Sequence, residues 1–199
     1  MLGKTHMVVG ASLYLAIAQP TDLKSLFAGM AVAIVGSEIS DIDEANSKAR
    51  KIFNSIFTCI VLITIALIFA VKQFGWNFTP PPCLETSKDL IAVLLLILVY
   101  GCISNHRNAM HSILIGFILS VIITVWIGNY GVYFFIAFLS HILLDTLNNK
   151  SVRLFFPLKK GVCLGICKAN GLVNNIILTI GTVYAGYRFY QYFISFLNF

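Results

Sequence analysis

Charged residues are scarce in this sequence, with 14 Lys and Arg and 8 Asp and Glu among 199 residues, or 11% of the chain. Soluble globular domains carry about 25% charged residues, so an ordinary soluble domain is excluded. The hydrophobic share of 58% and the mean hydropathy of +0.87 indicate a membrane protein instead. No internal repeat or low-complexity linker divides the chain, which predicts a single integral membrane domain over residues 1–199.

Several familiar functional patterns are also missing. The five cysteines are an odd number without a disulfide framework, and Cys163 and Cys167 lack the second close pair that a four-ligand zinc site requires. Four glycines follow no strand, so they predict helix packing rather than a phosphate-binding loop: Gly3, Gly10, Gly29 and Gly36. No His-Ser-Asp arrangement suggests a serine nucleophile.

What the sequence does contain is a series of apolar segments, which predicts an all-α, polytopic transmembrane bundle of about five to seven membrane segments. The first two segments are short, so they either span a thin part of the membrane or form a re-entrant hairpin. A turn at residues 20–22 separates them, and Thr21 or Asp22 caps the following helix. Three prolines at 80–82 break the chain after the third segment. The segments are approximately 7–18, 26–37, 52–71, 90–104, 112–127, 130–147 and 172–187.

The basic residues predict the orientation of this bundle, because Lys and Arg flanking membrane helices favour the cytoplasmic side. Alternate threading places most of them on one side, which we predict to be cytoplasmic at a bacterial-type inner membrane. Because membrane topology accounts for the positions of the basic residues, the net charge of +6 gives no reason to expect a nucleic-acid partner. The predicted cytoplasmic set is Lys4, Lys48, Arg50, Lys51, Arg107, Lys150, Arg153, Lys159, Lys160 and Lys168, against Lys24, Lys72 and Lys88 outside.

Ionisable side chains collect at the same cytoplasmic helix ends, and they include every histidine of the chain. Imidazole and carboxylate groups together suit a divalent ion, with zinc first and manganese or iron as alternatives. The number of candidates leaves room for two ions, of the kind that activate water in hydrolases. The candidate metal ligands are His6, Asp41, Asp43, His106, His111, His141 and Asp145.

Each part of this set also has a simpler interpretation. His141 and Asp145, four residues apart on one helix face, are compatible with an interhelical hydrogen-bonding pair. Residues 41–43 are compatible with a solvated turn. His106 and His111 are five residues apart and meet only if the turn between them reverses the chain. Their shared location at one membrane edge is what favours a metal site.

Three motifs in fixed order resemble the YdjM-type inner-membrane family, whose members are described as metal-dependent hydrolases. The resemblance extends over about residues 6–175 and implies that the seven candidates are metal-site positions. The site chemistry is also similar, more weakly, to that of zinc-dependent phospholipase C enzymes. The motifs are GSEISDID at 36–43, HRNAMHS at 106–112 and SHILLD at 140–145, preceded by His6.

The chain departs from the family pattern at several positions. The aspartate motif of the family usually reads Pro-Asp-x-Asp-His, whereas this chain has Ser40 and Glu44 at the outer positions. Asn108 and Met110 stand where Gly and Thr are usual. Near the start of the last helix, where many members carry an acid, this chain has Asn174 and Asn175. These departures imply an altered metal site, with Glu44 still able to act as a ligand.

The leading functional hypothesis is a membrane-embedded, metal-dependent hydrolase, phosphoesterase or phospholipase-like, that acts on a lipid or lipid-linked phosphoester at the cytoplasmic interface. Arg107 is expected to bind the substrate phosphate. The alternative is that its positive charge only sets the orientation of the protein in the membrane. Asp41 or Glu44 is the expected general base or second-metal ligand. The alternatives are a cation or proton-coupled transporter that uses the same cluster, and a partner protein with a decayed site. The sequence indicates no oligomeric state.

Overall fold

The computed structural model of the chain describes residues 1–75 and 88–197. These residues form helices and contain no β-strand, which confirms the all-α prediction for this part of the chain. The proline break predicted at 80–82 lies outside the described residues. In chain order the elements are α1 (Gly3–Ile17), α2 (Leu23–Glu38), η1 (Ile39–Asp43), α3 (Lys48–Phe74), α5 (Lys88–Ile103), η2 (Ala109–His111), α6 (Ile113–Ile127), α7 (Tyr130–Thr146) and α8 (Leu172–Leu197), where η marks a 3-10 helix.

A capping box starts α2 at one of the two residues that the sequence predicted as a cap. The Asp22 carboxylate accepts a hydrogen bond from the backbone N–H of Ser25 at 2.6 Å, and Ser25 Oγ accepts one from the backbone N–H of Asp22 at 3.2 Å. The bond from Ser25 lowers the pKa of the Asp22 carboxyl. At its other end α2 continues directly into η1, so the apolar stretch runs from Leu23 to Asp43 and is longer than predicted.

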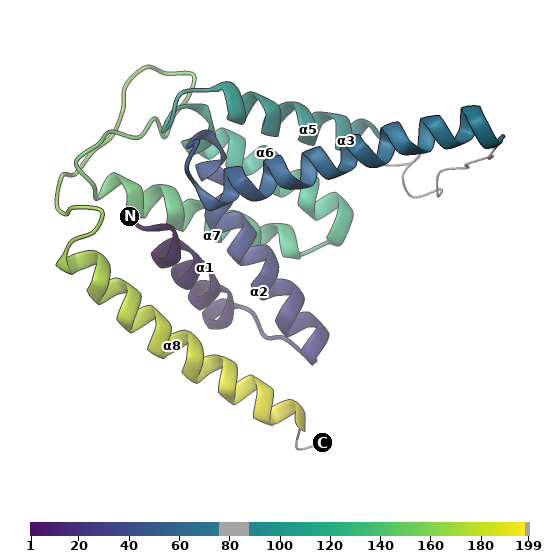
Figure 1. Cartoon of the computed structure of the whole chain (residues 1–199). Coiled ribbons are helices and arrows are strands. Elements are labelled where there is room, and N and C mark those ends of the chain that lie inside the picture. Colours follow the sequence, from purple (N-terminus) through teal and green to yellow (C-terminus); the bar gives the residue numbers. More distant parts are fainter. Residues whose placement is uncertain (76–87, 198–199) are drawn as a thin grey trace.

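The centre of the bundle is α2, which packs against both α1 and α7. α8 lies along α1, and α6 lies along α7 (Figure 1). The contact between α2 and α7 is so close that a Cβ atom on Gly36 would lie only 2.5 Å from the carbonyl oxygen of Phe134. A Cβ atom on Gly29 would overlap the ring of Tyr14. The prediction of helix packing is confirmed for Gly29 and Gly36.

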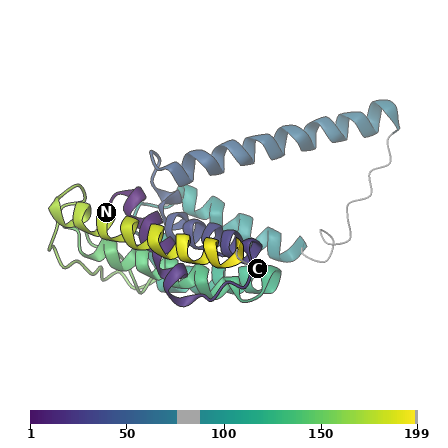
Figure 2. The ribbon, with the colours of Figure 1, turned by 90° about the horizontal axis from the view of Figure 1, so that it is seen from below.

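Two helical stretches of the described residues are long and apolar enough to cross a bilayer, Leu23–Asp43 and Lys48–Ala70. The second lies on α3, which extends away from the other helices (Figures 1 and 2) and buries 0% of its most apolar window inside the protein. Because such a surface needs an apolar environment, α3 is suited to lipid. α6 and α7 are apolar but shorter, so the predicted number of five to seven spans is not confirmed.

The segment between α7 and α8 secures the loop between α5 and α6. The backbone N–H of Arg153 donates to the carbonyl of Arg107 at 3.2 Å, and Arg153 Nη1 donates to Asn108 Oδ1 at 3.0 Å. The backbone N–H of Ile113 donates to the carbonyl of Leu154 at 3.0 Å. This fastening matters for the site because the secured loop carries His106 and His111.

Candidate metal centre

The seven residues predicted as metal ligands lie together at one end of the bundle. They come from the start of α1, from η1, from the loop and η2 before α6, and from the last turns of α7. Helix ends that are far apart in sequence therefore supply one polar cluster. It divides into two groups that could each hold a metal ion, Asp41 with Asp43, His106 and His111, and His6 with His141 and Asp145.

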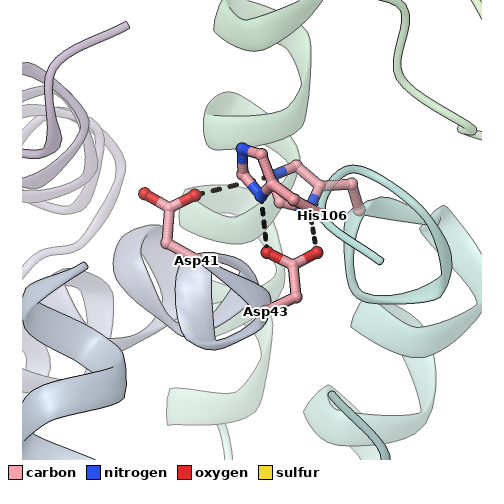
Figure 3. A group of neighbouring side chains, drawn as sticks. Asp41, Asp43 and His106 are labelled. Carbon is pink, nitrogen blue, oxygen red and sulfur yellow. Dashed lines mark hydrogen bonds and ion pairs between the residues drawn. The ribbon is translucent and has the colours of Figure 1, made fainter. Parts of the chain in front are cut away.

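The loop before η2 reverses the chain so that both of its histidines face Asp43 (Figure 3). Arg107, between them, adopts the left-handed backbone conformation with φ of 63°, which is uncommon for a residue with a side chain. The two imidazole rings consequently meet edge to face with centroids 5.1 Å apart. This turn satisfies the condition under which the sequence allowed the two histidines to meet.

Asp43 receives hydrogen bonds on both carboxylate oxygens. Since a carboxylate only accepts, Nδ1 of His106 donates at 2.7 Å and Nδ1 of His111 donates at 3.1 Å. The backbone N–H of Arg107 adds a third bond at 3.1 Å. With its Nδ1 occupied in this way, His111 directs Nε2 away from Asp43 and toward Asp41.

His141 is oriented in the same manner by a backbone group. Its Nδ1 donates to the carbonyl oxygen of Ser37, at the end of α2, with a distance of 2.6 Å. Nε2 of His141 then lies 3.4 Å from Asp41 Oδ1, and Nε2 of His111 lies 3.5 Å from the same oxygen. Neither contact has hydrogen-bond geometry, so both ring nitrogens are buried without a partner.

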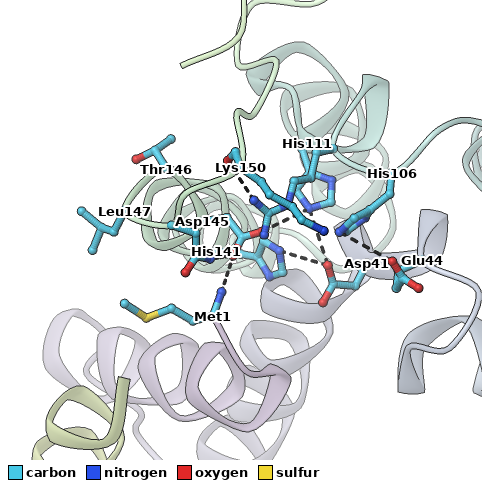
Figure 4. A network of polar contacts seen from close by, with 12 residues as sticks. Met1, Asp41, Glu44, His106, His111, His141, Asp145, Thr146, Leu147 and Lys150 are labelled. Carbon is cyan, nitrogen blue, oxygen red and sulfur yellow. Dashed lines mark hydrogen bonds and ion pairs between the residues drawn. The ribbon is translucent and has the colours of Figure 1, made fainter. Parts of the chain in front are cut away.

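Asp145 is the centre of the second group (Figure 4). Its Oδ1 lies 3.4 Å from His6 Nε2 and accepts a hydrogen bond from Asn148 Nδ2 at 3.0 Å. Its Oδ2 pairs with Arg107 Nη2 at 3.0 Å, and the amino group of Met1 also contacts the carboxylate. Oδ2 lies 3.8 Å from His111 Nε2, which connects the two groups.

The geometry of these atoms fits a metal ion. Nitrogen and oxygen ligands of a tetrahedral zinc ion, at about 2.0–2.2 Å from the metal, lie about 3.3–3.6 Å from one another. The contacts of Asp41 with His111 and His141, and of Asp145 with His6, have this spacing. Unpaired imidazole nitrogens in a protein interior are costly unless a ligand satisfies them. The cluster could therefore hold a divalent ion, whose identity the donor set does not select.

The electrostatics of His111 depend on the two aspartates. Complete burial lowers the pKa of its imidazole, but the negative charge of the nearby Asp41 and the hydrogen bond and charge of Asp43 outweigh burial and raise the pKa to about 9. Both ring nitrogens of His111 are therefore protonated at neutral pH when no cation is present, with the second proton on Nε2. A metal ion at the same position would replace that proton.

The remaining predicted residues lie around this cluster. Glu44 is 43% exposed and its Oε2 lies 3.8 Å from His106 Nε2. Arg107 reaches Asp145 and also donates from Nη1 to the carbonyl of Lys150 at 2.9 Å. Cys163 and Cys167 belong to neither metal-ligand group.

Asn174, where the family pattern suggests an acid, is wholly buried next to the start of α1. Its Oδ1 accepts hydrogen bonds from Thr5 Oγ1 at 2.8 Å and from the backbone N–H of Leu2 at 3.2 Å. It therefore secures the turn of α1 that carries His6, and it lies outside both ligand groups.

Two contributors were missed at the level of sequence. The carbonyl of Ser37 holds His141, and no side-chain pattern can reveal a backbone acceptor. Asn148, which donates to Asp145, follows it by three residues, and this one-turn spacing was a usable signal.

A helical fold with apolar helices of bilayer length and a buried His–Asp cluster at one end defines the class of helical membrane proteins with a candidate metal centre. The family model described as YdjM inner membrane protein matches residues 1–197, and the chain belongs to that family. The resemblance predicted from the three motifs is thus confirmed. No curated protein and no solved structure matches the chain.

Proposed function

We propose that this protein is a membrane-embedded, metal-dependent hydrolase that cleaves a phosphoester of a lipid or lipid-linked substrate. The observation that carries the proposal is the pair of buried, unpartnered Nε2 atoms of His111 and His141, both aimed at Asp41. Such an arrangement suits a metal ion better than a structural hydrogen-bond network, which would leave no nitrogen unsatisfied.

In this proposal Asp41 and His111 of the first group would hold one ion together with His141 of the second group, because His141 Nε2 lies 3.4 Å from Asp41 Oδ1. His6 with Asp145 would contribute to a second ion. Zinc suits this set of imidazole and carboxylate donors, with manganese and iron as alternatives. When bound, such ions supply Lewis-acid activation of water and of a phosphoryl oxygen.

The surrounding residues position the ligands and the substrate. Asp43 and the Ser37 carbonyl fix the ring orientation of His111 and His141 through their Nδ1 atoms. The guanidinium of Arg107, 3.0 Å from Asp145, is placed to hold a phosphate beside the ligands. Glu44 is the general base in this proposal, because Asp41 serves as a ligand and Glu44 is accessible to water.

We further propose that the bundle crosses the membrane several times, with α6 and α7 among the crossing helices and the metal centre at the cytoplasmic side. The positive residues at the same helix ends support this orientation. A site at headgroup depth meets lipid phosphoesters by lateral diffusion, which favours a lipid substrate over a soluble one.

The test is elemental analysis of the purified protein together with His141→Ala, followed by phosphate-release assays on phospholipid vesicles. We expect stoichiometric transition metal and lipid hydrolysis in the natural protein, and a lowered metal content with loss of hydrolysis in the variant. Absence of metal from the natural protein, or unchanged metal in His141→Ala, contradicts the proposal. Metal-dependent uptake into proteoliposomes without a hydrolysis product would support a transporter instead, and inactivity of a well-folded, metal-loaded protein would support a decayed site.

A further inference from the structure

A cavity of about 400 Å³ adjoins the metal centre between the start of α1, η1 and the start of α3. Asp41 forms part of its wall and also faces the unpartnered Nε2 atoms of His111 and His141. The Asp41 side chain is 19% exposed, whereas the side chains of His111 and His141 are fully buried and that of Asp145 is nearly so. The cavity is therefore a route from outside to the metal-facing carboxylate.

The cavity carries side chains of both charge signs. Lys4 and Lys48 line it together with Glu38 and Glu44. Among the described residues, neither lysine lies within 4.0 Å of a carboxylate. Cations and anions that face one cavity without pairing suit a ligand that itself carries both signs.

Glu38 specifies what kind of positive group would fit. Its Oε1 is buried and has no hydrogen-bond partner, although a carboxylate oxygen can only accept. A primary ammonium supplies N–H donors to such an oxygen, whereas a quaternary ammonium supplies none. Lys4 and Lys48 are then available for a phosphate.

The helix face beyond Lys48 indicates that the ligand is a lipid. Ile52 and Ile56 follow Lys48 at successive intervals of four residues, so the three residues share one face of α3. Ile52 is 59% exposed and Ile56 is 54% exposed. A headgroup in the cavity would thus continue into apolar surface of the kind that acyl chains cover.

We propose that this cavity binds the headgroup of a zwitterionic phospholipid that carries a phosphate and a primary ammonium. Lys4 and Lys48 hold the phosphate, Glu38 accepts from the ammonium, and the acyl chains lie along Ile52 and Ile56. This inference rests on the proposed function, because it names the substrate class that the metal centre would receive. It adds a specificity that the metal ligands alone do not provide.

The test compares three lipids with identical dihexanoyl chains, phosphatidylethanolamine, phosphatidylcholine and phosphatidylglycerol. Their affinities for the full-length, zinc-loaded protein in dodecyl maltoside are measured by thermophoresis. We expect phosphatidylethanolamine to bind about tenfold more tightly than the other two, as the loss of one charge-assisted hydrogen bond implies. Glycerophosphoethanolamine, which lacks the chains, should bind more weakly than the dihexanoyl lipid.

Variants assign the preference to the cavity. Lys4→Gln and Lys48→Gln should weaken binding of all three lipids, and Glu38→Gln should remove the preference for phosphatidylethanolamine. Lys24 is an exposed lysine at the opposite end of α2, so Lys24→Gln is the matched control and should leave the affinities for the three lipids unchanged. Metal content is measured on every sample and should stay constant.

Equal affinity for the three lipids in the natural protein overturns the inference without requiring any variant. Unchanged affinities in both lysine variants overturn it as well. A natural protein that takes up no zinc contradicts the proposed function instead, so the two failures are distinguishable. Preference for glycerophosphoethanolamine over the dihexanoyl lipid would overturn the assignment of a membrane lipid.

Discussion

Asp41 and Asp43 are two residues apart on η1 but contact different atoms of the same histidine. Asp43 accepts from Nδ1 of His111, and Asp41 faces Nε2 of that ring at 3.5 Å. Asp43 fixes the orientation of the ring, whereas Asp41 faces the unpartnered nitrogen. Removing one or the other should therefore have different consequences. In the proposed centre, Asp43 would therefore position the ring and Asp41 would act as the ligand.

The first prediction compares these two aspartates. Asp43→Asn should weaken zinc affinity by about 10–100-fold while full stoichiometry is still reached at saturation, because an orienting partner is impaired. Asp41→Asn should instead reduce the stoichiometry. Competition with a chromophoric chelator and elemental analysis measure the two effects. Asp89→Asn, at the exposed start of α5, is the control; an equal loss of stoichiometry in both test variants would show that Asp43 is itself a ligand.

The second prediction concerns protons at His111. Its pKa of about 9 in the metal-free protein means that the imidazole is protonated at pH 7, and zinc must displace that proton. We expect release of about one proton per zinc from this residue and an apparent affinity that rises with pH until about 9. Calorimetry in two buffers of different ionisation enthalpy measures the release, which His111→Gln should lower.

The raised pKa of His111 also affects the stability of the metal-free fold, which should fall with rising pH whereas the zinc affinity rises. A folded-state pKa above the ordinary value of 6.5 means that protonated His111 stabilises the metal-free fold below pH 6.5. This contribution is lost as the pH rises through about 9. Thermal unfolding of the metal-free protein between these two pH values should therefore show a decline that His111→Gln lacks.

At the scale of elements, the site depends on how closely α2 approaches α7. Gly36 permits this approach, and the adjacent Ser37 carbonyl receives the hydrogen bond from His141. Helix packing and the orientation of the candidate ligand His141 thus share one contact. A change in the distance between these helices reaches the metal centre even though Gly36 bears no functional group.

The third prediction follows from this contact. Gly36→Ala should destabilise the fold by about 1–3 kcal/mol, as overpacking in a close helix contact does, and should also weaken zinc binding. Gly186→Ala is the matched control, because a Cβ atom there would meet nothing within 4 Å. Thermal unfolding in detergent and chelator competition measure the two effects. Normal zinc affinity in a destabilised Gly36→Ala would mean that Ser37 does not control His141.

Much of the element arrangement could be predicted from hydropathy and charge. Alternate threading of the apolar segments brought the ends of α1, α2 and α7 to one side, and the structure places their histidines and aspartates in one cluster. The individual atomic pairings could not be predicted. The left-handed turn at Arg107 and the carbonyl of Ser37 depend on tertiary contacts that no side-chain pattern records.

For the whole molecule, the two ends of the bundle have different chemistry. At the end opposite the metal centre, a cavity of about 290 Å³ is lined by residues of the α1–α2 turn, including Thr21, and by Asn129 of the α6–α7 turn. These two turns therefore lie side by side. If α2 crosses the membrane, the α6–α7 turn reaches the same depth although α6 and α7 are shorter helices.

The fourth prediction uses this juxtaposition to test the crossing helices and their orientation. In a variant without native cysteines, Asn129→Cys and Lys24→Cys should react with a membrane-impermeant maleimide in intact spheroplasts. Lys159→Cys, in the segment after α7, should react only after permeabilisation, because the positive residues there favour the cytoplasm. Labelling of Lys159→Cys in intact spheroplasts would reverse the orientation. Protection of Asn129→Cys alongside labelling of Lys24→Cys would mean that α6 and α7 do not cross, because adjacent turns would otherwise share one compartment.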